Sequence, residues 1–203
     1  MPFPLIVGDR SFEDPAALAA FVREESLAPT LPDRPCDWVP ELVRQGVLEE
    51  RLATALSAAF LQHEEAATIC EGARLAVRLR DPVLGPILMR ALLEHDTAVL
   101  LQPDPAEADR SVEDTLLHAA PRVVDLADPD LRRPLLEALR NAGLPEEEVP
   151  VLARHGDAVD LRQWLPAVLA EGLSEEHRAL LEERARGEDE SAAVIAFLLG
   201  RSR

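Results

Sequence analysis

The sequence predicts an all-α fold, either an irregular α-solenoid of stacked antiparallel helix pairs or an irregular helical bundle. Apolar residues recur at helical spacing along most of the chain, and aromatic residues make up only 3% of it. A segment of similar sequence also occurs three times, which is typical of stacked helices. The exception is the stretch over residues 3–7, which is too short to form a sheet alone. We expect it to be an extended segment packed on the first helix.

The three similar segments begin at residues 81, 128 and 160 and read DPVLGPILMRALLEHD, DPDLRRPLLEALRNAG and DLRQWLPAVLAEG. Each carries leucines at four-residue spacing, which places them along one stripe of a helix. These are Leu84, Leu88 and Leu92, then Leu131, Leu135 and Leu139, then Leu161, Leu165 and Leu169. A single helix cannot bury such a stripe, so we expect the helices to stack, with Leu88, Leu135 and Leu165 nearly fully buried.

We expect one all-helical domain over residues 1–203, with an extended segment and capping helices in 1–46 and helical repeats in 47–203. The predicted helix caps are Asp14 with Pro15, Asp37, Ser111 in a capping box with Asp114, Asp128 with Pro129, and Ser174. Gly46 and Gly143 are expected just past helix ends. The apolar run over 48–80 should break near 62–65, and 102–110 should form a polar loop.

Two segments share a further pattern, in which aspartate, an apolar residue and arginine follow one another at a helix start. They are DPDLRR over residues 128–133 and DAVDLRQ over residues 157–163. The pattern resembles HEAT-type helical repeats over roughly residues 81–172. This resemblance implies polar ladders between repeats, formed by Asp130, Asp160, Arg132 and Arg162. The first segment departs from the pattern, because Gly85 stands where the second has Arg132.

The charge of the chain restricts its partners. The sequence holds 38 acidic residues and 21 arginines, with no lysine, for a formal net charge of −17. Such a chain repels phosphate backbones, so nucleic acid is not an expected partner. The absence of lysine excludes Schiff-base chemistry and a P-loop lysine. A partner protein with a basic surface fits the charge, although acidity can also serve solubility alone.

No catalytic or metal-binding motif is present, so we expect no cofactor and no metal, and the pattern favours a protein without catalytic activity. His63, His95 and His155 fall near predicted helix ends, where a partly cationic imidazole suits the helix dipole. Cys70 reads as a small buried apolar residue, and Cys36 as a looser, more exposed thiol that could be reactive. With no secretory signal and no apolar run of membrane-spanning length, we expect a cytoplasmic protein that does not enter a membrane.

The leading functional hypothesis is therefore a protein–protein interaction module, acting as a scaffold, adaptor or inhibitor. The alternative is a small helical enzyme or ligand sensor with a pocket between helices. The candidate partner-binding residues are Glu146, Glu147, Glu148, Glu188, Asp189, Glu190, Trp164, Arg74 and Arg78. The acidic triplets could instead only complement helix dipoles, and Trp164 could fill the core. Arg74 and Arg78 share a helix face and could bind a carboxylate or phosphate, or pair with Glu71 and other acids nearby.

Overall fold

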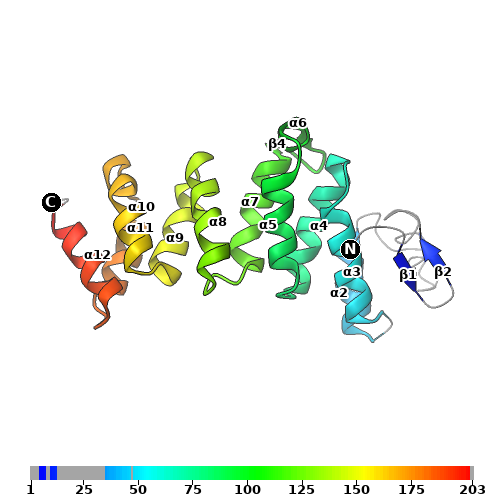
Figure 1. Cartoon of the computed structure of the whole chain (residues 1–203), viewed down its shortest axis with the longest axis horizontal. Helices are drawn as coiled ribbons and strands as arrows, with labels where there is room; N and C mark the ends of the chain where they lie inside the picture. Colours follow the sequence, from blue (N-terminus) through cyan, green and yellow to red (C-terminus); the bar gives the residue numbers. More distant parts are fainter. Residues whose placement is uncertain (1–4, 8–9, 13–34, 47, 202–203) are drawn as a thin grey trace. The chain divides into compact units, whose positions relative to one another are not determined.

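The computed structural model describes residues 5–7, 10–12, 35–46 and 48–201. Within these residues the chain forms eleven α-helices and two short antiparallel hairpins, so the all-α prediction is confirmed (Figure 1). The chain divides into two compact units, unit 1 (Met1–Val124) and unit 2 (Asp125–Arg203). The helix predicted to start at Asp14 lies outside the described residues.

Unit 1 is a two-layered stack of helices with a hairpin near each end of its sequence. In chain order it contains β1 (Leu5–Val7), β2 (Arg10–Phe12), α2 (Pro35–Arg44), α3 (Glu50–Leu61), α4 (Ala66–Leu79), α5 (Leu84–Glu94), α6 (Thr97–Leu100), β3 (Pro103–Asp104), β4 (Glu107–Ser111) and α7 (Val112–Val123). Helix α2 packs on α3 and α4, α3 packs on α4 and α5, and α7 packs on α4 and α5. Helices two apart therefore lie side by side, which is the arrangement that buries apolar stripes in a stack.

The tightest contact in unit 1 joins α3 to α4 and depends on a glycine. A Cβ atom placed on Gly72 would lie 2.7 Å from the backbone nitrogen of Leu61 and 2.8 Å from Cβ of Phe60. The backbones can approach this closely because glycine lacks a side chain. The hydroxyl of Ser57 donates a hydrogen bond to the Gly72 carbonyl oxygen at 3.0 Å across the same interface. Gly72 therefore sets the distance between the two helices.

Unit 2 is also a stack of helices, joined by connections of two to five residues. It contains α8 (Pro129–Asn141), α9 (Pro145–His155), α10 (Ala158–Glu171), α11 (Glu175–Arg184) and α12 (Glu190–Arg201). Helix α9 packs on α8, α10 and α11, and α12 packs on α10 and α11. Because only two residues join α9 to α10 and three join α10 to α11, neighbouring helices run in opposite directions. Helices α9 and α11 consequently run in the same direction, with their starts at one end of the unit.

The leucine stripes are buried as the sequence predicts. Leu88, Leu135 and Leu165 are each 0% exposed, which confirms the expectation for all three. Leu131 and Leu169, at the ends of their stripes, are only partly buried. Burial of the stripes stabilises each unit, because the driving force scales with the apolar area removed from water.

Most predicted helix boundaries are confirmed. The side chain of Ser111 accepts a hydrogen bond from Asp114 N–H in a capping box, and those of Asp128 and Ser174 cap α8 and α11. The long apolar run breaks between α3 and α4, as expected. Gly46 and Gly143 adopt positive φ angles of 70° and 66° after α2 and α8, which is the usual way for glycine to end a helix.

Three local predictions are wrong. Helix α2 begins at Pro35, two residues before the cap predicted at Asp37. Strand β1 is not a lone extended segment, because Leu5 pairs with Phe12 and Val7 with Arg10 in an antiparallel hairpin. The predicted polar loop over 102–110 contains the second hairpin, β3–β4. Two-stranded hairpins give little periodic signal in a sequence, because each strand here spans only two to five residues.

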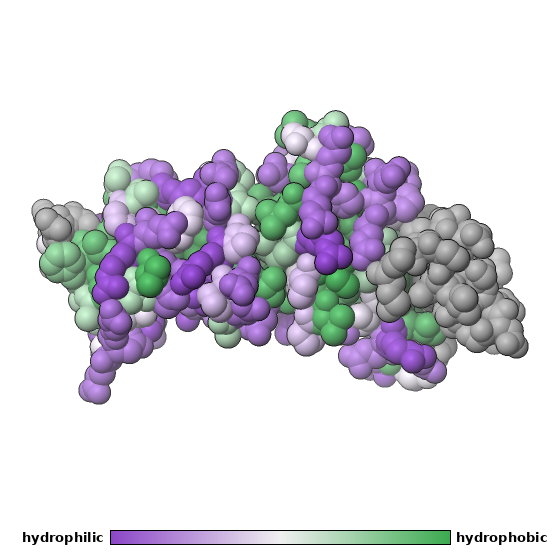
Figure 2. Space-filling view, viewed as in Figure 1, coloured by the Kyte–Doolittle hydropathy of each residue, from purple (hydrophilic) through white to green (hydrophobic). Residues whose placement is uncertain are grey.

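The surface is largely polar. On the face shown in Figure 2, hydrophilic side chains cover much of the helices of both units, with smaller apolar patches between them. The large apolar side chains that remain exposed include Val83, Leu93, Leu101, Val159 and Phe197. No helix within the described residues combines the length and the apolar composition needed to cross a membrane.

Candidate functional site

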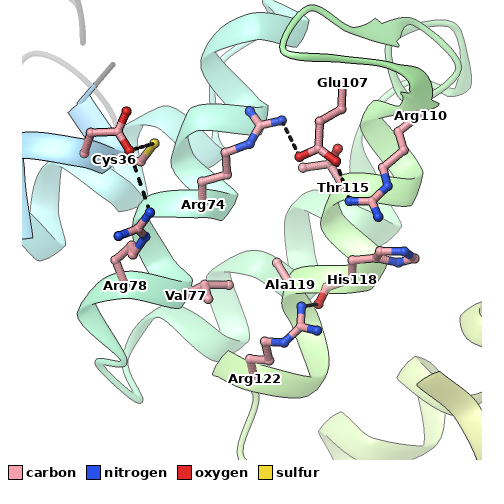
Figure 3. Close-up of a pocket in the computed structure, with 11 residues that line it drawn as sticks. Cys36, Arg74, Val77, Arg78, Glu107, Arg110, Thr115, His118, Ala119 and Arg122 are labelled. Atoms are coloured by element: carbon pink, nitrogen blue, oxygen red, sulfur yellow. Dashed lines mark hydrogen bonds and ion pairs between the residues drawn. The ribbon is translucent and has the colours of Figure 1, made fainter. Parts of the chain in front are cut away.

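A pocket of about 320 Å³ opens in unit 1 between the start of α2, helices α4 and α7, and strand β4 (Figure 3). We call it the arginine pocket, after the side chains of Arg74, Arg78, Arg110 and Arg122 that line it together with His118. Arg74 and Arg78 come from α4, Arg110 from β4, and Arg122 and His118 from α7. The pocket therefore collects cationic groups from three elements of an acidic chain.

Helical spacing explains how α4 and α7 supply this lining. Arg74 and Arg78 are four residues apart on α4, which places them one above the other on the same face. On α7, Thr115, His118 and Arg122 follow one another at spacings of three and four and line the opposite wall. The spacing on α4 placed Arg74 and Arg78 on one helix face, and Arg74 also pairs with Glu71, as the alternative interpretation expected. The contributions from α7 and β4 were missed.

Arg74 is the anchor of the β3–β4 hairpin. Its guanidinium binds the carboxylate of Asp104, which is fully buried, and also lies 3.4 Å from Glu71 and from Glu107. The hydroxyl of Thr115 donates a hydrogen bond to Asp104 at 2.6 Å. These contacts hold the hairpin against α4 and α7.

The Asp104 carboxyl stays ionised despite its position in the interior. Burial alone would raise its pKa, but hydrogen bonds from the Thr115 hydroxyl and the Ala106 N–H oppose that effect. The Arg74 guanidinium acts in the same direction, and the pKa of Asp104 lies below its ordinary value. Arg74 is therefore committed to an internal ion pair, and it is only 15% exposed.

The other three arginines are more exposed than Arg74. Arg78 is 60% exposed and lies 3.7 Å from the carboxylate of Asp37, a long and weak ion pair. Arg110 is bound more closely, at 2.6 Å from Glu107, and Arg122 donates a hydrogen bond to the carbonyl oxygen of His118 at 2.7 Å. A guanidinium has five N–H groups, so Arg78 and Arg110 keep donors beyond these two ion pairs.

Two features complete the interior of the pocket. The Nδ1 atom of His118 is buried and makes no hydrogen bond with the residues that the structure describes. Val77 and Ala119 give the lining an apolar surface between the arginines.

The sequence-predicted acidic residues behave differently from one another. The prediction that Glu148 binds a partner is wrong. Its side chain is 2% exposed and lies 3.3 Å from Arg140, so no partner can reach it. Burial raises the pKa of the Glu148 carboxyl, and the nearby Arg140 acts in the opposite direction. Glu146 is exposed, and Glu147 is partly buried.

Exposed carboxylates gather at one end of unit 2. Glu146 lies in the first turn of α9, and Glu175 and Glu176 lie in the first turn of α11. Since α9 and α11 pack together and run in the same direction, these three exposed side chains lie at one end of the unit. We call this surface the acidic end. Sequence reasoning missed Glu175 and Glu176, although Ser174 marked the helix start beside them.

The acidic residues Glu188, Asp189 and Glu190, at the start of α12, mostly form contacts within unit 2. Glu190 binds Arg162 at 2.6 Å, and Asp189 binds Arg184 at 2.7 Å and caps α12 by accepting from the Ala192 N–H. Glu188 is exposed. These contacts tie the start of α12 to neighbouring elements rather than leave three carboxylates for a partner.

A polar ladder links alternate helices of unit 2. Arg132 on α8 binds Asp160 on α10, and Arg162 on α10 binds Glu190 on α12. The resemblance to HEAT repeats placed Arg132, Asp160 and Arg162 in such contacts. Asp130, the fourth residue that it implicated, is exposed in the first turn of α8. In unit 1, where Gly85 replaces the arginine, Thr54 on α3 instead donates a hydrogen bond to Asp81 before α5.

The remaining candidate residues are placed as follows. Trp164 is partly buried on α10, and its Nε1 atom is enclosed without a hydrogen bond to any described residue. Cys36 is 2% exposed, so the expectation of a loose, exposed thiol is wrong. Cys70 is fully buried as predicted, and burial, reinforced by the charge of Asp104, raises its pKa to about 12.

The histidines do not assemble a site. His63 and His95 follow the ends of α3 and α5, as predicted, and His155 ends α9. The expected cationic role is wrong for His155, because burial, together with Arg132 and Arg154, lowers the pKa of its imidazole. The described residues contain no group of histidine, cysteine and acidic side chains placed to hold a metal ion.

Comparisons of the chain with protein-family models, curated proteins and solved structures find no match in any of the three.

Proposed function

We propose that this protein is a non-catalytic helical-repeat module of the HEAT type that binds a partner protein through a basic surface on that partner. In this role it serves as a scaffold, adaptor or inhibitor. The observation that carries the proposal is the acidic end, where Glu146, Glu175 and Glu176 are exposed at the starts of two helices that pack together. Parallel helices present such residues side by side, which suits recognition of a surface rather than of a small molecule.

The electrostatic field of the chain supports the same proposal. A formal net charge of −17 attracts a basic partner from a distance and raises the rate of encounter. Glu171, at the end of α10, adds another exposed carboxylate close in sequence to Glu175, although it also binds Arg140 at 2.7 Å. The helix dipole favours glutamate in a first turn as well, so the same residues stabilise α9 and α11 and present charge to a partner.

The first test is a capture experiment from native cells with three baits. The baits are the native chain, the variant E146Q/E175Q/E176Q, and a control variant E49Q/E50Q/E64Q. The control removes the same number of charges from exposed positions in unit 1. We expect at least one basic protein, identified by mass spectrometry, to be held by the native and control baits and lost by the first variant. Capture that is equal for all three baits would contradict the role of the acidic end.

The second test uses the captured partner in purified form. Raising the salt concentration from about 0.05 M to about 0.5 M should slow association markedly, because the Debye length shrinks below 10 Å. The dissociation rate should change less, since charge outside the contact acts mainly on encounter. An association rate that does not change with salt would show that the negative charge serves solubility only.

A further inference from the structure

We propose that the exposed face of α12 in unit 2 forms a contact between two copies of this chain, related by a twofold axis. Three features of unit 2 support this contact: an apolar groove beside α12, an exposed phenylalanine in that groove, and the balance of charge around it. The contact does not involve Glu146, Glu175 or Glu176 of the acidic end. Its failure would therefore leave the proposed function standing.

A groove of about 360 Å³ runs along α12, on the side where this helix packs on α10. Its lining is mostly apolar and consists of Arg162, Glu190, Ala193, Val194, Phe197 and Leu198. Phe197 is 61% exposed, although an aromatic ring gains more from burial than most side chains do. A hollow apolar surface with an exposed aromatic residue is typical of a contact with another protein chain.

Both the inner and the exposed face of α12 are apolar. The inner face packs against the rest of unit 2 and contains the buried residues Ala192, Ile195 and Leu199. The exposed face contains Ala193, Ala196, Phe197 and Gly200. A surface helix usually carries charged residues on its exposed face, and α12 does not follow that rule. The small residues around Phe197 leave room for a second aromatic ring beside it.

The charge around the groove fits a second copy of the same chain. Two chains with a formal net charge of −17 repel each other, so they can associate only where the local charge is balanced. The groove has that balance, because its lining includes one arginine and one carboxylate, Arg162 and Glu190. Residues 191–200 of α12 include no charged residue. A strongly basic partner would find little charge complementarity there.

A twofold axis makes the two charges complementary between copies. In such a contact, each pairing of two residues across the axis occurs twice, once in each direction. Arg162 of one copy can then pair with Glu190 of the second copy at two symmetric points. Within one chain the two side chains bind each other at 2.6 Å, but they are 56% and 70% exposed. An ion pair this exposed contributes little to stability, so the exchange of partners costs little.

The polar ladder favours a twofold contact over a head-to-tail stack of copies. Its arginines, Arg132 and Arg162, are 30 positions apart, and the next position at this spacing is Ala192. Ala192 is buried and cannot supply the guanidinium that a further acidic residue would meet. The ladder therefore ends at α12, and a helix pair added in the same direction would lack the contact that links α8 to α10 and α10 to α12.

Sedimentation equilibrium of the full chain measures the association. One chain has a mass of 22.3 kDa, and an ionic strength of about 0.3 M screens most of the repulsion between copies. We expect the mean mass to rise toward that of two chains with a dissociation constant of about 10–100 µM, because a contact limited to two helices is small. The mass of a single chain at every concentration up to about 1 mM would overturn the proposal. Growth beyond two chains would also overturn it, since a twofold contact closes at a dimer.

A pair of variants places the contact on α12. F197Q removes the exposed ring and should weaken association by at least about tenfold, because buried aromatic residues dominate such contacts. The matched control is L93Q, since Leu93 is 57% exposed on α5 in unit 1. This control should change the dissociation constant less than about twofold. Circular dichroism confirms that both variants are folded. Equal losses in F197Q and L93Q would show that association does not use α12 and would contradict the proposal.

An exchange of charges tests the twofold pairing itself. R162E and E190R should each weaken self-association, because like charges then meet at both symmetric points. When the two variants are mixed, opposite charges meet at both points, so the mixture should associate at least about tenfold more tightly than either variant alone. A change within one chain cannot produce this recovery. If the mixture associates no more tightly than its components, the twofold contact is wrong.

Discussion

The Nε atom of Arg132 lies 2.7 Å from Oδ2 of Asp160 and joins α8 to α10 across 28 positions of sequence. Both side chains are buried, at 4% and 0% exposed. The remaining donors of Arg132 reach the Asp157 carboxylate and the carbonyl oxygen of Leu126, each at 2.9 Å. Because the guanidinium is surrounded by acceptors, its removal from water is offset by hydrogen bonds. These bonds fix the position of the start of α8 relative to the start of α10.

Removing Arg132 should destabilise unit 2 strongly. We expect R132A to lower the free energy of unfolding by about 3 kcal/mol, because Asp160 then stays buried with Arg133 as its remaining cationic partner. The matched control is R162A, which breaks the exposed end of the same ladder and should cost less than about 1 kcal/mol. Urea denaturation followed by circular dichroism measures both. Equal losses of unfolding free energy in R132A and R162A would show that burial of the Arg132–Asp160 pair adds nothing to stability.

Shortening a stripe leucine should open a cavity. We expect L135A to lower the free energy of unfolding by about 2–5 kcal/mol, since Leu135 is fully buried and its neighbours can relax only in part. The same substitution at Leu93, which is 57% exposed, should change it by less than about 0.5 kcal/mol. Thermal and urea denaturation check the two variants. A small effect of L135A would mean that the stripe does not hold the helices together.

Acid should weaken the anchor of the β3–β4 hairpin. The folded-state pKa of Asp104 is lowered, so its contribution to stability is present above its ordinary pKa of 3.8 and is lost as the pH falls through the folded value. We expect the stability of the native chain to fall below about pH 4 more steeply than that of D104N, which cannot titrate there. Urea denaturation across pH 3–7 gives both profiles. Parallel profiles would contradict the ionised state of Asp104.

The thiol of Cys70 should resist alkylation in the folded protein. With a pKa of about 12, Cys70 has almost no thiolate near neutral pH, and its side chain is also fully buried. We expect C36S, in which Cys70 is the remaining thiol, to react with iodoacetamide only after urea unfolds the chain. Mass spectrometry follows the reaction over time. Reaction at the rate of free cysteine under native conditions would show that α4 opens readily.

Much of the fold could be predicted because helix starts and apolar stripes are local signals. Ser111 with Asp114 and Asp128 with Pro129 mark helix starts within four residues, and the structure has caps at both. The β3–β4 hairpin could not be found in this way. Its position depends on Asp104 meeting Arg74, 30 residues away, and no local pattern records such a pair.

The candidate site was predictable only in part for the same reason. The spacing of Arg74 and Arg78 placed the two arginines on one helix face, where they could bind an anion or pair with acidic residues nearby. Arg110 and Arg122 join them only because α7 packs on α4 and β4 packs on α7. The spacing of His118 and Arg122 on α7, in a chain with few basic residues, was the signal that could have indicated the contribution of α7 to the pocket. Glu148 shows the opposite error, since its neighbours Glu146 and Glu147 made a buried residue look like surface.

The contacts of the polar ladder recur at a regular spacing in the sequence. Arg132 and Asp160 are 28 positions apart, and so are Arg162 and Glu190. A tandem duplication of residues 130–159 would put the second copy of Asp130 28 positions after the first Arg132, in the place that Asp160 now occupies. The second copy of Arg132 would then meet Asp160 itself. Such a duplication would add the residues of one helix pair to unit 2 and would keep the 28-residue spacing between ladder partners.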